Sequence, residues 1–273
     1  MTRFVCSTCG TQYGDRTDPP DRCAICSDDR QYVGWSGQHW TTLEALQAAH
    51  SVRFEVDDGL LGVGITPAFG IPQRSLVLPT PAGNILWEAT SLVTAAAVAE
   101  LEAVGGITTI VISHPHFYAS MVEWSEAFGG VPIVLHANDR EWIARPSEHI
   151  ELWDGDVLPL TDGVTLYRCP GHFPGSTVLH STAGPNGRPI LLAGDALHVA
   201  QDRRHVSFMY SVPNHVPSHP DDVEEIRRRL DTVDFDDLYG FTWGLNIIGG
   251  ARACVDESFE RYFRAVGRSP VRT

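Results

Sequence analysis

The stretch Ile107-Thr-Thr-Ile-Val-Ile112 leads directly into Ser113-His114-Pro115-His116. A six-residue run with four isoleucine or valine side chains and no charge is typical of a strand buried on both faces. Residues that leave a strand at positions i and i+2 can both turn toward one ion. His114 and His116 are therefore a predicted pair of metal ligands.

Two later strand ends carry further ligand residues. Gly171-His-Phe-Pro-Gly-Ser176 follows a predicted strand over 164–169, and Gly194-Asp195 follows another over 190–193. A single histidine is more often a surface or core residue than a ligand. Three strand ends that offer His-x-His, His and Asp together favour a metal site formed by His114, His116, His172 and Asp195.

Four of the six cysteines fall within the first 26 residues, as Cys6-x-x-Cys9 and Cys23-x-x-Cys26. In a reducing compartment this spacing predicts a tetrathiolate metal site and not disulfides, because each C-x-x-C turn points two sulfurs at one ion. The surrounding residues resemble a shortened rubredoxin or zinc-ribbon knuckle pair. We predict a structural zinc ion. Iron also fits four thiolates, but no flavin or other redox motif follows for it to serve.

The chain changes character after this ribbon. Residues 1–40 are predicted to form the four-cysteine module and residues 41–273 a second, larger domain. Helices are expected over 43–49, capped by Thr41 or Thr42, and over 94–104, 119–128, 139–144 and 221–230. Strands are expected over 52–56, 60–65, 75–78, 85–87, 107–112, 132–136, 164–169, 176–181 and 190–193. Strands mixed with helices in this way indicate a layered α/β or α+β domain.

Taken together, these motifs resemble the metallo-β-lactamase superfamily over about residues 52 to 250. The resemblance implies an α+β fold, a four-layer αβ/βα sandwich with metals at the strand ends. His114 and His116 match the first two histidines of the family's H-x-H-x-D-H motif. His172 matches the later glycine-flanked histidine, and Asp195 matches the aspartate that ordinarily bridges two metals.

The chain departs from the family pattern at every residue dedicated to a second metal. Tyr118 and Ala119 stand where the family has Asp-His, and Trp243 stands where a late histidine is expected. A neutral tyrosine is a poor zinc ligand and alanine is none. We therefore expect a single ion, Zn²⁺ or Fe²⁺, at the histidine site.

The remaining ligands suffice for hydrolysis. A divalent ion with three nitrogen ligands and an open position lowers the pKa of bound water from about 15.7 to about 7. Asp195 is predicted to complete the coordination or to act as general base, and Tyr118 to donate a hydrogen bond to a substrate oxyanion. Trp243 is predicted to wall the substrate pocket, and His198 to approach the site from the loop of Asp195. For Tyr118 and Trp243 the alternative is plain packing.

The leading prediction is a single-metal hydrolase that uses metal-bound hydroxide on an ester, thioester or amide-type small molecule. One alternative is a mononuclear iron-dependent oxidoreductase or dioxygenase, since two histidines and Asp195 also form a facial triad for Fe(II). The other is a non-catalytic metal-binding protein that has kept the fold.

Charge and composition narrow the expected partners. The 273 residues carry 20 basic and 34 acidic side chains, a formal net charge of −14. Such a surface repels phosphate backbones and anionic lipids, so we expect a small-molecule substrate and neither nucleic acid nor membrane as a partner. Every basic residue is an arginine, which excludes Schiff-base and phosphate-loop lysine chemistry. No signal peptide or membrane span is predicted, which favours a cytoplasmic protein.

Overall fold

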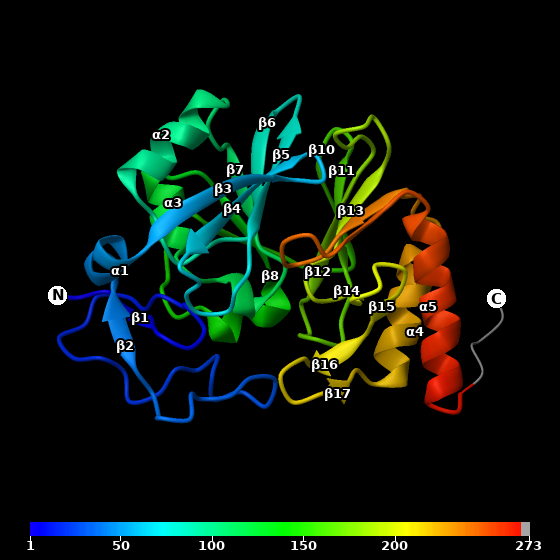
Figure 1. The fold of residues 1–273 in the computed structure, drawn as a ribbon, viewed down its shortest axis with the longest axis horizontal. Helices are drawn as coiled ribbons and strands as arrows, with labels where there is room; N and C mark the ends of the chain where they lie inside the picture. Colours follow the sequence, from blue (N-terminus) through cyan, green and yellow to red (C-terminus); the bar gives the residue numbers. More distant parts are fainter. Residues whose placement is uncertain (269–273) are drawn as a thin grey trace. The chain divides into compact units, whose positions relative to one another are not determined.

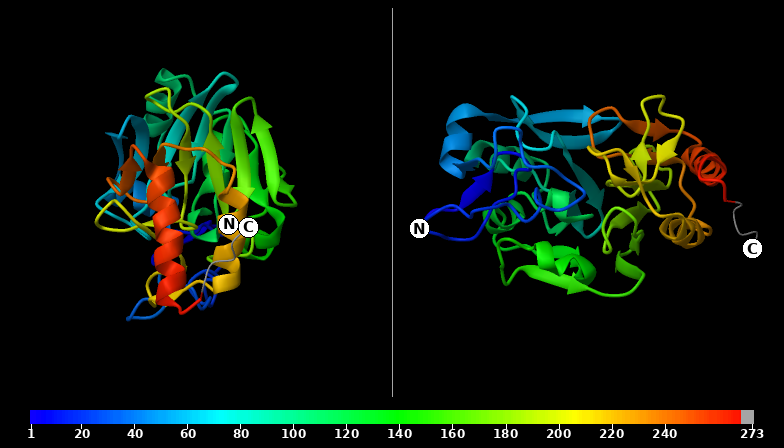
Figure 2. Two further views of the ribbon diagram at one scale, coloured as in Figure 1. Left: turned by 90° about the vertical axis from the view of Figure 1, so that its right-hand side faces the viewer. Right: turned by 90° about the horizontal axis from the view of Figure 1, so that it is seen from below.

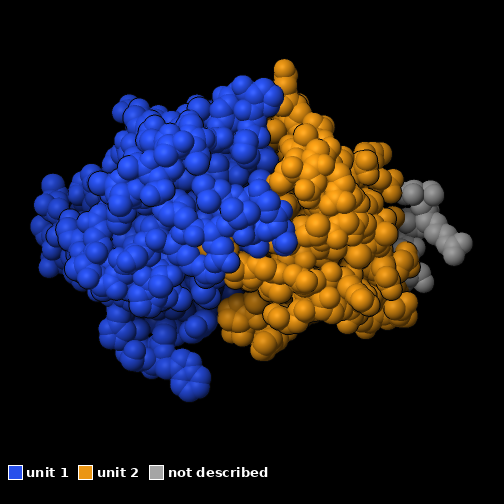
Figure 3. Space-filling model, turned by 45° about the horizontal axis from the view of Figure 1, so that its top comes forward, with its two compact units in different colours: residues 1–153 blue, residues 154–273 orange. Residues whose placement is uncertain are grey.

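The computed structural model describes residues 1–268, and the chain divides into two compact units, residues 1–153 and 154–273 (Figures 1 and 3). Each unit holds one large mixed sheet with helices. The cysteine-rich segment lies within the first unit. A boundary near residue 40, between a four-cysteine module and the rest, stays a prediction.

The first unit is built on a seven-stranded sheet in the order β3-β4-β5-β6-β7-β8-β9. Its first four strands pair antiparallel, and β6 to β9 are parallel. The strands are β3 (Ser51–Asp57), β4 (Leu60–Thr66), β5 (Ser75–Thr80), β6 (Gly83–Trp87), β7 (Thr109–Val111), β8 (Ile133–His136) and β9 (Ile150–Trp153). The predicted strands of this stretch are confirmed, and β9 adds to them.

Helices connect the parallel strands, because parallel pairing requires a crossover. α2 (Ala95–Ala103) joins β6 to β7, α3 (Met121–Ala127) joins β7 to β8, and the 3-10 helix η2 (Ala137–Trp142) lies between β8 and β9. The carboxyl ends of these strands consequently share one edge of the sheet, the edge where open α/β sheets bind ligands. The segment after β7, with the 3-10 helix η1 (Pro115–Phe117), begins at that edge.

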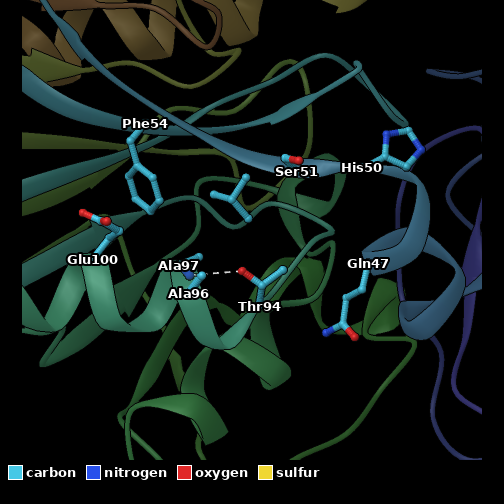
Figure 4. Close-up of a pocket in the computed structure, with 9 residues that line it drawn as sticks. Gln47, His50, Ser51, Phe54, Thr94, Ala96, Ala97 and Glu100 are labelled. Carbon is cyan, nitrogen blue, oxygen red and sulfur yellow. Dashed lines mark hydrogen bonds between the residues drawn. The ribbon is translucent and has the colours of Figure 1, made fainter.

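Threonine side chains begin two helices of this unit. Thr42 accepts a hydrogen bond from the Ala45 N–H at 3.2 Å in front of α1 (Leu43–Ala49). Thr94 accepts one from the Ala97 N–H at 3.0 Å in front of α2 (Figure 4). Both caps satisfy backbone donors that the first turn of a helix leaves unpaired. The predicted helices over 43–49 and 94–104 are confirmed.

The cysteine-rich segment forms a small ribbon. β1 (Phe4–Cys6) pairs antiparallel with β2 (Trp40–Thr42), which leads into α1. The ribbon has its own core, in which the four cysteines pack with Tyr13 and Ile25. The Tyr13 ring lies edge-on to Trp40, with 5.0 Å between the ring centroids.

The second unit contains a six-stranded sheet in the order β10-β11-β12-β13-β18-β19. Its strands are β10 (Val157–Thr161), β11 (Val164–Arg168), β12 (Thr177–Ser181), β13 (Ile190–Leu192), β18 (Asp237–Tyr239) and β19 (Asn246–Ile248). β11 and β13 both pair antiparallel with β12, and β18 is parallel to β13. The strands β11, β13 and β18 therefore run in one direction and end at one edge of the sheet.

Two helices of the second unit, α4 (Pro220–Leu230) and α5 (Ala251–Ala265), lie side by side (Figures 1 and 2). Their buried side chains, among them Val223, Ile226, Phe259 and Phe263, belong to one core with Leu191 of the sheet. Two small sheets complete the unit, β14 (His198–Val199) with β15 (Val206–Ser207) and β16 (Met209–Ser211) with β17 (Val216–Pro217). The predicted helix over 221–230 is confirmed by α4, and α5 adds to the predicted elements.

Within residues 1–268, no helix is both long and apolar enough to cross a membrane.

Candidate metal centres

The four sulfurs of Cys6, Cys9, Cys23 and Cys26 lie within 4.8 Å of one another. Sγ of Cys6 is 3.6 Å from Sγ of Cys26, and Sγ of Cys9 is 3.5 Å from Sγ of Cys23. A disulfide would bring two sulfurs to about 2.05 Å. Zn–S bonds of about 2.3 Å place the sulfurs of a tetrahedral site about 3.8 Å apart. The spacing fits a metal site and excludes disulfides.

Burial supports the same interpretation of the four cysteines. None of their side chains is more than 3% exposed. Burial holds the pKa of the Cys9 thiol well above its usual range, because a buried thiolate loses its hydration. A bound cation supplies the compensation that four buried thiolates need. The side chain of Gln38 donates a hydrogen bond to the Cys6 sulfur at 3.2 Å and accepts one from the Cys23 N–H at 3.1 Å.

His114 and His116 follow β7 in the first unit. Both side chains are buried, and their rings stand edge to face with 5.1 Å between centroids. The Nδ1 atom of His114 lies 2.7 Å from the hydroxyl oxygen of Ser113. A hydrogen bond donated by Nδ1 to this hydroxyl leaves Nε2 as the atom that can bind a metal.

Glu88, which sequence reasoning missed, positions the start of residues 113–119, the histidine segment. It follows β6 directly, has a left-handed φ of 70° and is 1% exposed. Its carboxylate accepts a hydrogen bond from the Ser113 N–H at 3.0 Å, and its own N–H donates to the Val111 carbonyl at 2.8 Å. Glu88 directly follows a predicted strand, as the candidate metal ligands do. The same signal could have identified it.

Tyr118 is buried, and its hydroxyl donates a hydrogen bond to the Asp139 backbone carbonyl at 3.2 Å. Burial raises the pKa of this phenol well above its usual value, and the charges of Asp139 and Glu88 act in the same direction. Tyr118 is thus a neutral phenol held by backbone. Its action as an oxyanion donor stays a prediction, and it would require the hydroxyl to exchange this partner.

His172 of the second unit lies on a tight loop after β11. The Phe173 N–H donates to the Ser176 hydroxyl at 2.8 Å, and the Ser176 N–H donates to the Phe173 carbonyl at 3.1 Å. Gly171 has a φ of 115°, and a Cβ there would lie 3.1 Å from the Ser218 hydroxyl. Glycine is therefore required at this position.

The His172 ring is oriented by backbone carbonyls. Its Nδ1 lies 3.0 Å from the Tyr210 carbonyl and 3.1 Å from the Met209 carbonyl, so we assign the ring proton to Nδ1. Nε2 is then the unprotonated nitrogen, and it lies 3.5 Å from an oxygen of Asp195. Two ligands bonded to zinc at 2.0–2.1 Å in a tetrahedron lie about 3.3–3.4 Å apart. The two atoms have the spacing of metal ligands.

Asp195 follows β13 at the shared edge of the second sheet. It is 5% exposed, and the left-handed turn at Gly194 (φ 51°) turns it out of the strand. The turn between β18 and β19, which carries Trp243, leaves the same edge. The ring of His198 packs against Phe241 of this turn, with 5.0 Å between centroids. His172, Asp195, His198 and Trp243 thus gather at one side of this unit's sheet.

A buried cysteine and a surface pocket lie outside the two groups of candidate metal ligands. Cys169 is fully buried in the core of the second unit, and burial raises its pKa to about 12, which makes it inert as a nucleophile. A pocket of about 570 Å³ lies between β3, the end of α1 and the start of α2 (Figure 4). Its lining includes His50 and Glu100, but neither belongs to a group of three candidate ligands within the described residues.

Solved structures with a similar fold include metallo-β-lactamases. One is the first B3 metallo-β-lactamase with an active-site glutamic acid, with a TM-score of 0.51 and 19% identity over 78% of this chain and 88% of that one. Another is MIM-1 from Novosphingobium pentaromativorans, with a TM-score of 0.51 and 21% identity over the same shares. MEM-A1, a subclass B3 enzyme from a soil metagenome library, has a TM-score of 0.51 and 16% identity over 79% and 94% of the two chains. The chain has the metallo-β-lactamase fold, and the predicted fold class is confirmed.

Comparison with a sequence relative shows the family to which the chain belongs. The chain is 38% identical over 269 residues to YmaE, an uncharacterized protein of Bacillus subtilis strain 168, and the match covers 97% of each chain. The chain therefore belongs to the same family as YmaE. No family model matches the sequence.

Proposed function

We propose that this protein is a metal-dependent hydrolase that holds one divalent ion at His114, His116, His172 and Asp195. Its substrate is an ester, thioester or amide-type small molecule. The observation that carries the proposal is the His172–Asp195 pair, whose nitrogen and oxygen lie 3.5 Å apart while two backbone carbonyls face the other ring nitrogen. Second-sphere carbonyls of this kind fix the tautomer of metal-binding histidines.

The chemistry of the donor set supports hydrolysis. Three imidazoles and one carboxylate are ligands that suit zinc and iron. With the three imidazoles bound, the fourth position of the ion would be open to a water of pKa about 7. Asp195 carries the only carboxylate of the set, so it would either complete the coordination or accept a proton from the metal-bound water. Ser113 and the carbonyls of Met209 and Tyr210 orient two of the imidazoles.

One ion fits the residues better than two. The Tyr118 hydroxyl is bound to a backbone carbonyl, and Ala119 and Trp243 offer no ligand atom for a second ion. Trp243 and His198 provide an aromatic wall for the substrate.

At the four-cysteine site we propose a structural zinc ion, because all four ligands are supplied by cysteine and no position is open. The net charge of −14 favours neutral or cationic substrates over nucleic acid or anionic membranes.

Metal analysis and turnover test the proposal together. Protein purified without added metal should contain two zinc ions per chain and hydrolyse at least one class in a panel of activated esters, thioesters and amides. His172→Ala should lose one ion and all hydrolysis. Cys254→Ser, which removes a half-buried thiol outside both clusters, is the matched control and should retain both. Iron at the histidine site with O₂ consumption would favour a dioxygenase instead, and metal without turnover would favour a binding protein.

A further inference from the structure

The first cysteine turn contacts the segment that carries His114 and His116. Gln12, three residues after Cys9, donates its backbone N–H to the Ala119 carbonyl at 2.9 Å. Ala119 lies three residues after His116 and has a φ of 32°, a left-handed conformation that is uncommon outside glycine. The hydrogen bond from the ribbon thus holds a strained turn just beyond the second histidine.

The Gln12 side chain makes a second connection. Its amide nitrogen donates to the Glu123 carboxylate at 3.1 Å, and its amide oxygen accepts from the Arg145 guanidinium. Arg145 also pairs with Glu123 at 3.1 Å. Glu123 lies on α3, the helix that follows the histidine segment. Gln12 is 2% exposed and Arg145 7%, so loss of a partner in this network leaves buried polar groups unsatisfied.

A third connection passes through Gly10, which directly follows Cys9. It has a φ of 86°, and a Cβ there would lie 2.1 Å from the Ser91 hydroxyl, so the turn packs against Ser91 without room for a side chain. The Ser91 carbonyl accepts a hydrogen bond from the Ser120 hydroxyl at 2.9 Å. Ser120 is the last residue before α3. Three contacts therefore run from the turn at 6–12 to the residues that follow His116.

We propose that the four-cysteine site positions the histidine segment. An ion held by the four cysteines fixes the turn at 6–12, and Gln12 then fixes the backbone that presents His114 and His116 to their metal. The proposal rests on the proposed function, because it requires a metal at the histidine site. Its consequence is that metal affinity at the histidines depends on the four-cysteine site. Such coupling is reciprocal between the two ions.

Gln12→Ala tests the contact between the ribbon and the histidine segment without a change to the four-cysteine site, because all four cysteines stay in place. The probe is Co²⁺ titrated into the full chain with zinc in the four-cysteine site, followed by visible absorption and by competition with a chelator. Gln12→Ala removes the side-chain contacts to Glu123 and Arg145 and keeps the backbone hydrogen bond to Ala119. We expect it to bind Co²⁺ at the histidine site about 10-fold more weakly than wild type, because buried Arg145 loses a hydrogen-bond partner in the network that holds α3. Gln47→Ala is the matched control, since the Gln47 amide donates to the Val93 carbonyl at 2.7 Å, outside this network. It should bind like wild type.

Hydrogen exchange supplies a readout that needs no metal at the histidines. The backbone amides of residues 117–121 should exchange faster in Gln12→Ala than in Gln47→Ala, and faster still in Cys23→Ser after loss of the ribbon's ion. Unchanged exchange together with unchanged Co²⁺ affinity in both Gln12→Ala and Cys23→Ser would overturn the positioning role. Absence of Co²⁺ binding in wild type, with exchange accelerated as expected, would overturn the proposed function but not the contact between ribbon and segment.

Discussion

The two candidate metal centres differ in how the chain builds them. The four-cysteine site draws all its ligands from residues 6–26, and two sequence-local turns bring its sulfurs together. The candidate histidine and aspartate ligands come from strand ends separated by up to 81 residues, and hydrogen bonds to Ser113, Met209 and Tyr210 orient two of the imidazole rings. The geometry of the four-cysteine site is thus set by two local turns. The orientation of the candidate ligands at the histidine site depends on hydrogen bonds with residues elsewhere in the chain.

This difference predicts different roles and different sensitivities. Four cysteine ligands would fill a tetrahedral coordination sphere and leave no position for substrate, so an ion there would act on folding. A site whose ligands include a carboxylate beside an imidazole, with oriented rings, suits a catalytic ion. Loss of a single ligand should therefore affect stability at the first site and turnover at the second.

The largest expected effect on turnover comes from His172→Ala. It removes the nitrogen that lies 3.5 Å from Asp195 and leaves an incomplete ligand set. We expect hydrolysis to fall by roughly 10⁴-fold or more, because the activation of water by the ion is lost. Mass spectrometry of the native protein should show one ion fewer, with the ion of the four cysteines retained. Retention of both ions would refute the assignment of His172.

The second prediction concerns Asp195→Asn, which keeps the shape of the side chain and removes its charge and basicity. If Asp195 acts mainly as a base, turnover should fall by roughly 10²–10⁴-fold while the metal stays bound. If it acts mainly as a ligand, metal affinity should fall as well. Metal content and turnover measured on the same sample separate the two roles. Full occupancy with full turnover would remove Asp195 from the mechanism.

The sequence predicted most regular elements because their signals are local. The cap at Thr42 and the apolar pattern of 43–49 suffice for α1, and the bounds agree with the structure. Helix α5 lies outside the prediction, although Ala251, Val255, Phe259 and Phe263 recur every four residues and form its buried face. This spacing is the amphipathic signal of a helix. The missed strands β14 to β19 have two or three residues each, too few for a period to be detected.

The candidate metal ligands were predictable because their signals are local in the sequence. The spacing of the cysteines and the residues after the strands supplied every candidate ligand. The contacts that hold the side chains of the candidate site were not predictable, because their partners are distant in sequence: Met209 lies 37 residues from His172, and Asp139 lies 21 residues from Tyr118. A hydroxyl's partner depends on packing in three dimensions, which no local pattern encodes.

The third prediction tests whether neighbours tune the histidine site. Ser113→Ala removes the hydroxyl that lies 2.7 Å from Nδ1 of His114 and frees the ring to rotate or to change tautomer. We expect metal affinity at the histidine site to fall by about 10–100-fold, with the ion of the four cysteines unaffected. Chelator competition measures both. An affinity equal to that of wild type would mean that packing alone orients His114.

The smallest effect is expected from Gln38→Ala, the corresponding change at the four-cysteine site. It removes a hydrogen bond to the Cys6 sulfur and the acceptor of the Cys23 N–H. Gln38 is only partly buried, so water can replace both contacts, and the cost should be only about 0.5–1.5 kcal/mol, or roughly 2–10-fold in metal affinity. Chelator competition for the ribbon's ion measures it, with Gln47→Ala as the reference for loss of a glutamine outside both sites. A loss larger than that of Ser113→Ala at its own site would reverse the comparison. It would show that the cysteine ion depends on its neighbours at least as strongly as the histidine ion does.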